Sequence, residues 1–346
     1  MKVDKKTKFI QKLEKILIKG ASNDEKNASF VINTGKYKYI LRIRQIYNQY
    51  AGMYQYRIDL GGRKKGCVLL TFSCPFINNN NDIVMKMCKH GHLAFVTYFP
   101  SCSLNGDLLP GNGTKHMLKT ALALSCDICE KLHNFKLEGF TLQDNSRKMC
   151  NEKESISLRH ASLLLNSMTY YEKHFNAIIH NEQIYQSYRD LVNTMTKNRL
   201  PSFHEFSLLY SVPFEHNSIL EPLYVESNTI IDFCSKIRDM YPDDFCRLCS
   251  GWVENFVNSH LKWINWTEWF IPSSNIKTIK VTDWEFKGDN DTIREVLIED
   301  ANFIQTGGFA DIQSSKQYIA NPNGKKHEVW GTLAQLDPIN DGWIPC

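Results

Sequence analysis

A short glycine-containing loop is the sharpest chemical signal in the sequence. It reads Leu-Pro-Gly-Asn-Gly-Thr over Leu109–Thr114 and joins an apolar run, Leu93–Phe99, to an amphipathic stretch, Thr114–Lys131. Successive backbone N–H groups in such a loop can converge at the start of a helix, where the helix dipole adds partial positive charge, and together they can hold a phosphate or pyrophosphate. Glycine suits this role because a side chain would block the ligand's approach. The alternative is an ordinary turn between a strand and a helix.

The eleven cysteines are the second group of reactive side chains. Their number is odd and the N-terminus has no secretory signal pattern, so we expect free thiols and a reducing, cytoplasmic compartment. Two pairs, Cys126 with Cys129 and Cys246 with Cys249, have the spacing of zinc ligands. Both pairs fall in helical patterns, where cysteine packs as a small apolar residue, so no metal site is predicted. A cysteine protease with Cys150 as nucleophile is a further alternative, although Cys150 lies in a polar stretch rather than at a helix start.

Four stretches in the first half have the patterns of strands. Apolar and polar residues alternate over Tyr37–Arg44 and Tyr54–Leu60, which is the two-residue period of half-buried strands. Two continuous apolar runs, Cys67–Phe72 and Leu93–Phe99, are bounded by glycine and proline and are typical of central strands buried on both faces. We expect these four strands to form an antiparallel meander.

The period then becomes helical, with one strand in between. A helical stripe follows the glycine loop, Phe140–Leu142 has the pattern of a short strand, and Ser155 is expected to cap a helix that runs to Phe175. The resulting order, β-β-β-β-α-β-α, predicts an α/β domain, a mixed sheet flanked by helices, over residues 30–180. From residue 181 to 346 we expect a mostly helical region with an irregular C-terminal arm.

This order of elements resembles the GNAT family of N-acetyltransferases. In that family a β-meander leads into an Arg/Gln-x-x-Gly-x-Gly/Ala loop, a long helix, a strand that ends near an asparagine, and a helix that ends in a Tyr-Glu-Lys-like element. The corresponding stretches here span about 140 residues: Leu93–Tyr98, Leu108–Gly113, Thr114–Lys131, Phe140–Asn145 and Tyr170–Phe175.

The resemblance implies that the chain binds acetyl-CoA and transfers its acetyl group to an amine. The pantetheine would lie between two splayed strands, and Tyr171 or Tyr170 would protonate the leaving thiolate. The implied cofactor-binding residues are those of the loop, whose N–H groups would hold the pyrophosphate, and one residue beyond the following strand: Gly111, Asn112, Gly113, Thr114, Lys115 and Asn145.

Several positions depart from the family pattern. Leu108 stands where the family has Arg or Gln, and the run Leu93–Phe99 holds no acidic residue. The base that takes the proton of the amine would then be His92 or His90, because histidine titrates closest to neutral pH. An insertion, Arg147–Glu154, separates Asn145 from the tyrosines.

A second resemblance carries no chemistry. The stretches Phe140–Cys150 and Ile156–Ala177 are similar to uncharacterised proteins of large nucleocytoplasmic DNA viruses. This similarity implies a viral source. It also supports an alternative function, a catalytically inactive structural or virion-associated protein that keeps a degenerate GNAT-like fold.

The two ends of the chain carry expectations about partners. Residues 1–29 contain a basic amphipathic helix, because Phe9, Leu13, Ile16 and Leu17 recur at helical spacing among seven lysines of Lys2–Lys19. We expect it to dock on the domain, and contact with an anionic surface is the alternative. The C-terminal arm, rich in tryptophan and proline turns, suggests a protein partner. No apolar run approaches the roughly 20 residues of a membrane helix, so no membrane span is expected.

Overall fold

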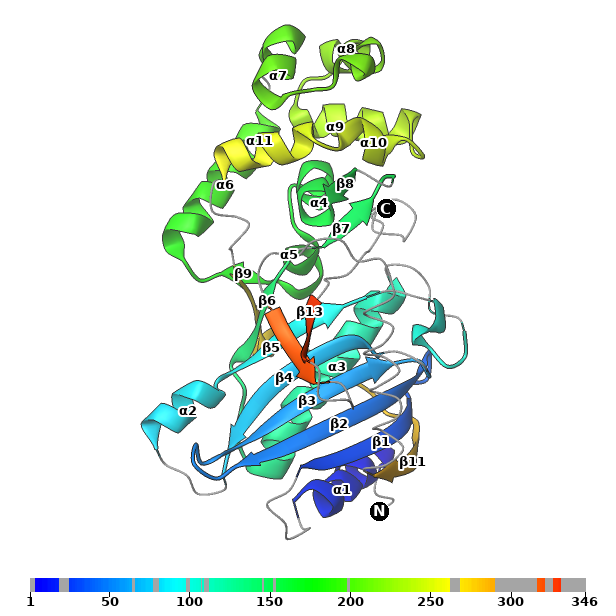
Figure 1. Ribbon diagram of the computed structural model, residues 1–346, viewed down its shortest axis with the longest axis vertical. Coiled ribbons are helices and arrows are strands. Elements are labelled where there is room, and N and C mark those ends of the chain that lie inside the picture. The colour runs from blue at the N-terminus through cyan, green and yellow to red at the C-terminus, as the bar shows by residue number, and fades with distance from the viewer. Residues whose placement is uncertain are drawn as a thin grey trace. The chain divides into compact units, whose positions relative to one another are not determined.

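The computed structural model describes residues 4–18, 25–63, 66–76, 81–97, 100–106, 108, 112–144, 146–151, 154–197, 200–261, 268–289, 316–320 and 326–330. It divides into two units (Figure 1). Unit 1 combines the chain up to Leu142 with the segment from Ile271 through the strand that ends at Asp289, and unit 2 is the intervening chain, Gln143–Phe270. The predicted α/β class, a mixed sheet flanked by helices, is confirmed.

Unit 1 is built on a twisted sheet that is antiparallel except at one pair. Its strands follow the spatial order β11 (Asp283–Asp289), β1 (Lys26–Asn33), β2 (Lys38–Asn48), β3 (Met53–Gly61), β4 (Gly66–Pro75), β5 (His90–Val96) and β6 (Gly139–Gln143). Only β5 and β6 run parallel. A parallel neighbour requires a crossover connection, and the long helix α3 (Asn112–His133) supplies it.

Helix α3 covers one face of this sheet, as Figure 1 shows. Its stripe of Met117, Leu118, Ala121 and Leu122 is fully buried. The Tyr56 hydroxyl of β3 hydrogen-bonds to Nε2 of His133, 2.6 Å away, near the end of the helix. The strand faces toward α3 are apolar, and this burial of apolar surface is the main stabilising contribution to the layer.

Helix α1 (Lys5–Leu17) docks on β1 and β11, as expected from the sequence, and Lys6 forms an ion pair with Asp127 of α3. Phe9, Leu13 and Leu17 are buried, and Asp4 caps the helix by accepting from the Thr7 N–H at 2.9 Å. The Phe9 ring packs edge-on against Phe30 of β1, with centroids 5.1 Å apart. Unit 1 also contains helix α2 (Asp82–Cys88) and two short helical turns, η1 (Pro100–Cys102) and η4 (Ser273–Asn275). It includes a separate two-stranded ladder of β12 (Lys316–Ala320) and β13 (Lys326–Trp330).

Unit 2 is mostly helical. It begins with a two-stranded ladder, β7 (Arg147–Met149) and β8 (Ser155–Ser157), and β9 (Ile178–Ile179) pairs antiparallel with β10 (Glu268–Pro272). The helices are α4 (Leu158–Asn166), α5 (Tyr170–Phe175), α6 (Glu182–Thr196), α7 (Phe203–Tyr210), η2 (Phe214–His216), α8 (Asn217–Val225), α9 (Ile230–Met240), α10 (Phe245–Cys249) and α11 (Trp252–His260). An aromatic cluster around Phe206, Phe233 and Trp252 forms their core.

Several predicted elements differ in extent. The run predicted as a strand buried on both faces, Leu93–Phe99, is β5, which begins at His90 and exposes one face. The predicted helix from Ser155 to Phe175 is interrupted at Ser167, whose φ of 56° is left-handed, and it is capped by Ser157 rather than Ser155. The ranges 30–180 and 181–346 do not coincide with the two units, because the chain leaves the unit 1 sheet at residue 142 and returns to it with β11.

The expectation of free thiols is wrong for six cysteines. Three disulfides join Cys67 to Cys102, Cys74 to Cys129, and Cys150 to Cys246, with Cα separations of 5.9, 5.9 and 5.3 Å. One cysteine of each Cys-x-x-Cys pair is therefore bonded elsewhere, so neither pair can offer two thiolates to zinc. Cys150 is likewise unavailable as a protease nucleophile. The structure explains these pairings by proximity between elements far apart in sequence, which spacing alone could not indicate.

Among the residues that the structure describes, no helix combines the length and the apolar character needed to cross a membrane.

Candidate functional site

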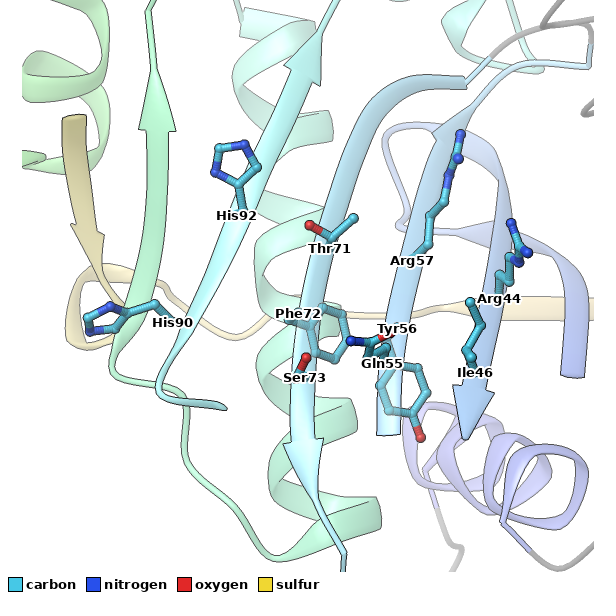
Figure 2. Close-up of a pocket in the computed structure, with 10 residues that line it drawn as sticks. All are labelled: Arg44, Ile46, Gln55, Tyr56, Arg57, Thr71, Phe72, Ser73, His90 and His92. Carbon is cyan, nitrogen blue, oxygen red and sulfur yellow. The ribbon is translucent and has the colours of Figure 1, made fainter. Parts of the chain in front are cut away.

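A row of polar side chains crosses five strands of the unit 1 sheet. The register pairs Arg44 of β2 with Arg57 of β3, Arg57 with Thr71 of β4, Thr71 with His92 of β5, and His92 with Thr141 of β6. Residues that pair directly across strands point to the same face of a sheet. Figure 2 shows the first four side by side on neighbouring strands, with α3 behind the sheet. These five residues are called the cross-strand row below.

The two-residue period of the strands places this row on the face away from α3. In β2 and β3 the hydroxyls of Tyr39 and Tyr56 hydrogen-bond to His116 and His133 of α3. Arg44 is an odd number of residues from Tyr39, and Arg57 directly follows Tyr56, so both arginines point the other way. The face opposite the helix therefore carries the polar residues.

The cross-strand row borders a shallow pocket of about 410 Å³. The pocket is lined by four of the row's residues and by further side chains of the same four strands, among them Ile46, Gln55, Ser73 and His90 (Figure 2). Guanidinium, amide, hydroxyl and imidazole groups thus surround one small volume. All of these groups can donate hydrogen bonds, and none of the described residues that line the pocket has a carboxylate.

The two arginines of the row differ in their partners. Arg44 donates from Nη2 to Oε2 of Glu25 at 2.6 Å, an ion pair in which both side chains are more than a third exposed. Arg57 makes neither a hydrogen bond nor an ion pair with any residue that the structure describes, and its Nε is enclosed without a partner. The Nε of Arg44 is enclosed without a partner as well.

Beside the row lies a buried acid–base pair. Arg42 of β2 faces Asp59 of β3, with Nη1 and Oδ1 3.9 Å apart, and Arg42 also donates to the carbonyl oxygens of Gly62 and Arg63. Burial raises the pKa of the Asp59 carboxyl, and the charges of Arg42 and Arg57 act in the opposite direction. This pair accounts for Arg42 but leaves the Arg57 guanidinium without a hydrogen-bonded counterion.

The two histidines of β5 are exposed. Nδ1 of His92 lies 3.2 Å from the Thr141 hydroxyl of β6, and Nε2 of His90 lies 3.4 Å from Oε2 of Glu138. His92, the base expected from the sequence, is therefore accessible and is oriented by its neighbour in the row. An accessible imidazole in this position can accept a proton from a ligand or donate a hydrogen bond to one.

The glycine loop is described only from its second half. Helix α3 begins at Asn112, while Gly111 lies outside the described residues. Gly113 and Thr114 are buried in the first helical turn, and the Thr114 hydroxyl is enclosed without a hydrogen-bond partner. A Cβ added to Gly113 would lie 2.7 Å from Cγ of Leu108. Leu108 thus fills the space beside Gly113, and this packing explains why position 113 has a glycine.

Strands β5 and β6 pair in parallel over a short stretch that ends at a bulge. His90 to Leu93 pair with Gly139 to Leu142, and the register between β4 and β5 shifts directly after Leu93, so Ala94 is the extra residue of the bulge. A bulged residue keeps backbone groups that the ladder does not use, and bulges are frequent next to active sites.

The remaining predicted residues lie in unit 2 or outside the described chain. Tyr170 and Tyr171 are buried in α5, and burial raises the pKa of both phenols above the ordinary value. Asn145 lies outside the described residues. His92 and the loop belong to unit 1, and the tyrosines belong to unit 2.

Comparison with known proteins found no match to a family model, to a curated protein or to a solved structure. The site therefore has to be interpreted from its own chemistry. Sequence reasoning did not select Arg44, Arg57 or Thr71. Their only signal was their place at polar positions of alternating strands, and their convergence depends on a register that no single strand specifies.

Proposed function

We propose that unit 1 binds an acyl-CoA and transfers its acyl group to an amine. The observations that carry the proposal are the parallel pair of β5 and β6, which α3 connects along the chain, and the bulge at Ala94 in the pairing of β5 with β4. A pantetheine arm contains two amides, and backbone groups left unpaired at a bulge can hydrogen-bond to them as a neighbouring strand would. This is the order of elements that the resemblance to GNAT acetyltransferases implies.

The proposed reaction is a direct acyl transfer. The amine nitrogen attacks the thioester carbonyl, the C–N bond forms and the C–S bond breaks, and the thiolate leaves as the sulfur of CoA. His92 accepts the proton that the amine loses. A thiolate also needs a proton at the end of the reaction. The resemblance predicts Tyr171 or Tyr170 as the donor, and both lie buried in unit 2, so unit 1 by itself provides no assigned donor.

The start of α3 fits an anionic cofactor in part. The first N–H groups of any helix lack partners within the helix, so those of Asn112–Lys115 suit a pyrophosphate. The enclosed Thr114 hydroxyl, which has no partner, adds a polar group there. Leu108 fills the space beside Gly113, so the glycine itself gives no separate support for a bound phosphate.

A second candidate function is favoured by the disulfides. Structural disulfides are typical of proteins that work outside a reducing cytosol. The three bonds therefore support the alternative of a catalytically inactive structural protein, for example of a virus particle. Contact of residues 2–19 with an anionic surface stays a prediction, and Lys5 and Lys6 are already paired with Asp283 and Asp127. The predicted partner surface on the C-terminal arm falls outside the described residues.

Calorimetric titration with acetyl-CoA separates the two functions. We expect acetyl-CoA to bind at a single site at least tenfold more tightly than adenosine 3′,5′-bisphosphate, which lacks the pantetheine arm. With an amine acceptor, His92→Gln should lower kcat by about 10² without changing acetyl-CoA affinity. A chain that binds no acetyl-CoA at roughly 1 mM would support the structural alternative instead.

A further inference from the structure

The Arg57 guanidinium is a charged group of unit 1 that has no hydrogen-bonded counterion among the described residues. It is half-buried, its Nε is enclosed without a partner, and it faces another arginine, Arg44, directly across the β2–β3 pair. Like charges directly opposite on paired strands are destabilising, and a buried donor without an acceptor costs further free energy. Such a group is retained in a fold most readily where a ligand completes it.

We propose that the cross-strand row is a binding site for the phosphate group of a phosphorylated ligand. The Arg57 fork and the Thr71 hydroxyl would hold the phosphate from neighbouring strands, with His92 on the far side of Thr71 (Figure 2). The phosphate site shares His92 with the acyl-transfer proposal but does not depend on it, because Arg57 of β3 and Thr71 of β4 have no part in that proposal.

The geometry favours phosphate over a carboxylate. Donors come from consecutive strands, and neighbouring strands are about 4.8 Å apart, so the donors reach an anion from several directions. A carboxylate is planar and presents two oxygens, which a single guanidinium fork satisfies. A phosphate presents three oxygens in a tetrahedral arrangement, so it can accept from the arginine, the hydroxyl and the imidazole at once.

The charge around the pocket also suits a dianion. Glu25 pairs with Arg44, Asp59 lies by Arg42, and no carboxylate is among the lining residues. A phosphate bound to Arg57 would neutralise the charge of its guanidinium group. It would also reduce the electrostatic repulsion between Arg57 and Arg44. The lining hydroxyls and amide, Ser73 and Gln55, could contact the remainder of the ligand.

The test is a calorimetric titration of the full chain with inorganic phosphate, without CoA or nucleotide. Its result therefore does not depend on the acyl-CoA proposal. Wild-type protein and four variants are compared: Arg57→Gln, Arg57→Lys, Thr71→Val and, as the matched control, Arg63→Gln. Arg63 is exposed and lies beyond the end of β3, so its replacement removes the same charge outside the row.

We expect phosphate to bind the wild type and Arg63→Gln with equal affinity, and Arg57→Gln to bind at least about tenfold more weakly. Arg57→Lys keeps the charge but loses the fork, so its affinity should be intermediate. Thr71→Val keeps the shape of the side chain and should lose several-fold, which provides a result even if Arg57→Gln does not fold. Phosphate affinity that is absent in the wild type, or unchanged within twofold in Arg57→Gln and Thr71→Val, would overturn the proposal.

Discussion

His133 is an imidazole that the fold keeps neutral. It lies at the end of α3 with its Nε2 hydrogen-bonded to the Tyr56 hydroxyl, which also accepts a hydrogen bond from the Gln45 amide. Burial lowers the pKa of His133 to about 4. In the unfolded chain the same side chain titrates near its ordinary value of 6.5. The native state therefore binds fewer protons than the unfolded state between these two values.

A measurable pH dependence follows from this difference. The contribution of neutral His133 to stability is fully present above pH 6.5 and is lost as pH falls toward 4, and it amounts to about 3 kcal/mol in total. Urea unfolding at pH 7.5, 5.5 and 4.5 measures it. His133→Gln, which does not titrate, should show a smaller loss of stability over this range than the wild type.

The comparison has to be made between these two proteins, because His116 and His160 also have lowered pKa values and contribute to both curves. Parallel curves for wild type and His133→Gln would show that His133 is not kept neutral by the fold.

Gly113 provides a residue-level test of the loop. Because a Cβ there would lie 2.7 Å from Cγ of Leu108, Gly113→Val should destabilise unit 1 by roughly 1–3 kcal/mol through overpacking. Thermal unfolding measures this cost. In the background of Leu108→Ala the same replacement should cost much less, since the space is then open.

An equal cost in both backgrounds would mean that the penalty does not come from Leu108. The acetyl-CoA affinity of folded Gly113→Val separates packing from binding: an affinity equal to that of the wild type would remove the N–H of Gly113 from the proposed pyrophosphate site.

At the residue scale the sequence identified the loop glycines and His92 as candidates, but not the arginines of the cross-strand row. A loop motif is local in sequence, so it can be recognised without a fold. Arg44, Arg57 and Thr71 become neighbours only through the pairing of three strands, and a shift of one residue in either register would place them on opposite faces.

At the scale of elements, the start of α5 is stabilised by hydrogen bonds between Thr169 and Glu172. The Thr169 hydroxyl accepts a hydrogen bond from the Glu172 N–H, and the Glu172 carboxylate accepts one from the Thr169 N–H, which is a capping box. The same carboxylate accepts a hydrogen bond from the Tyr188 hydroxyl of α6. The cap thus fixes both the start of α5 and its link to the next helix.

Replacement of the capping hydroxyl should weaken unit 2. Thr169→Ala is expected to cost about 1 kcal/mol, because one N–H of the first turn loses its acceptor in a buried position. Thr169→Ser keeps the hydroxyl and is the matched control, expected within a few tenths of the wild type. Denaturant unfolding followed by circular dichroism compares them. If serine and alanine cost the same, the hydrogen bond is not the source of the effect.

Helices and strands with a clear period were predicted closely, and interruptions were missed. Periodicity located α3, and the alternation of polar and apolar residues located β2 and β3. The break between α4 and α5 at Ser167 was not visible, because apolar spacing continues across it and a left-handed serine has no strong sequence signal. The break at Gly251, with φ of 84°, separates α10 from α11 in the same way.

At the scale of the whole molecule, the disulfides define an oxidised state that can be measured. Peptide mapping without reduction should recover the pairs Cys67–Cys102, Cys74–Cys129 and Cys150–Cys246, and should leave Cys88, Cys126, Cys234 and Cys249 free for alkylation after unfolding. Detection of these six cysteines as thiols in native protein would contradict the pairings.

The disulfide that spans the largest number of residues, Cys150–Cys246, should contribute most to the stability of unit 2. Cys150 and Cys246 are separated by 96 residues, and closing a loop of that length in the unfolded chain corresponds to about 4.7 kcal/mol. The double variant Cys150→Ser/Cys246→Ser should therefore unfold at lower denaturant concentration. Cys126→Ser, at a partly exposed free cysteine, is the control and should change little.

The class of the fold could be predicted from the sequence, whereas its connectivity could not. The order of strands and helices up to residue 142 predicts the mixed sheet. The sheet then acquires an edge strand, β11, from beyond unit 2. Sequence patterns contain no information on the partner of this strand, because pairing over some 250 residues is decided by tertiary packing.

This late strand has a consequence for synthesis of the chain on the ribosome. Strand β1 ends at Asn33, and its outer neighbour β11 begins at Asp283 of the 346 residues, so the outer edge of β1 stays unpaired until most of the polypeptide has emerged. Trp284, which packs on Phe9 and Phe30, arrives equally late. An uncovered strand edge invites pairing with another nascent chain. Polypeptides whose translation stops before Asp283 would therefore be prone to aggregation. A chaperone that holds unfolded chains would be needed most while unit 2 is being synthesised.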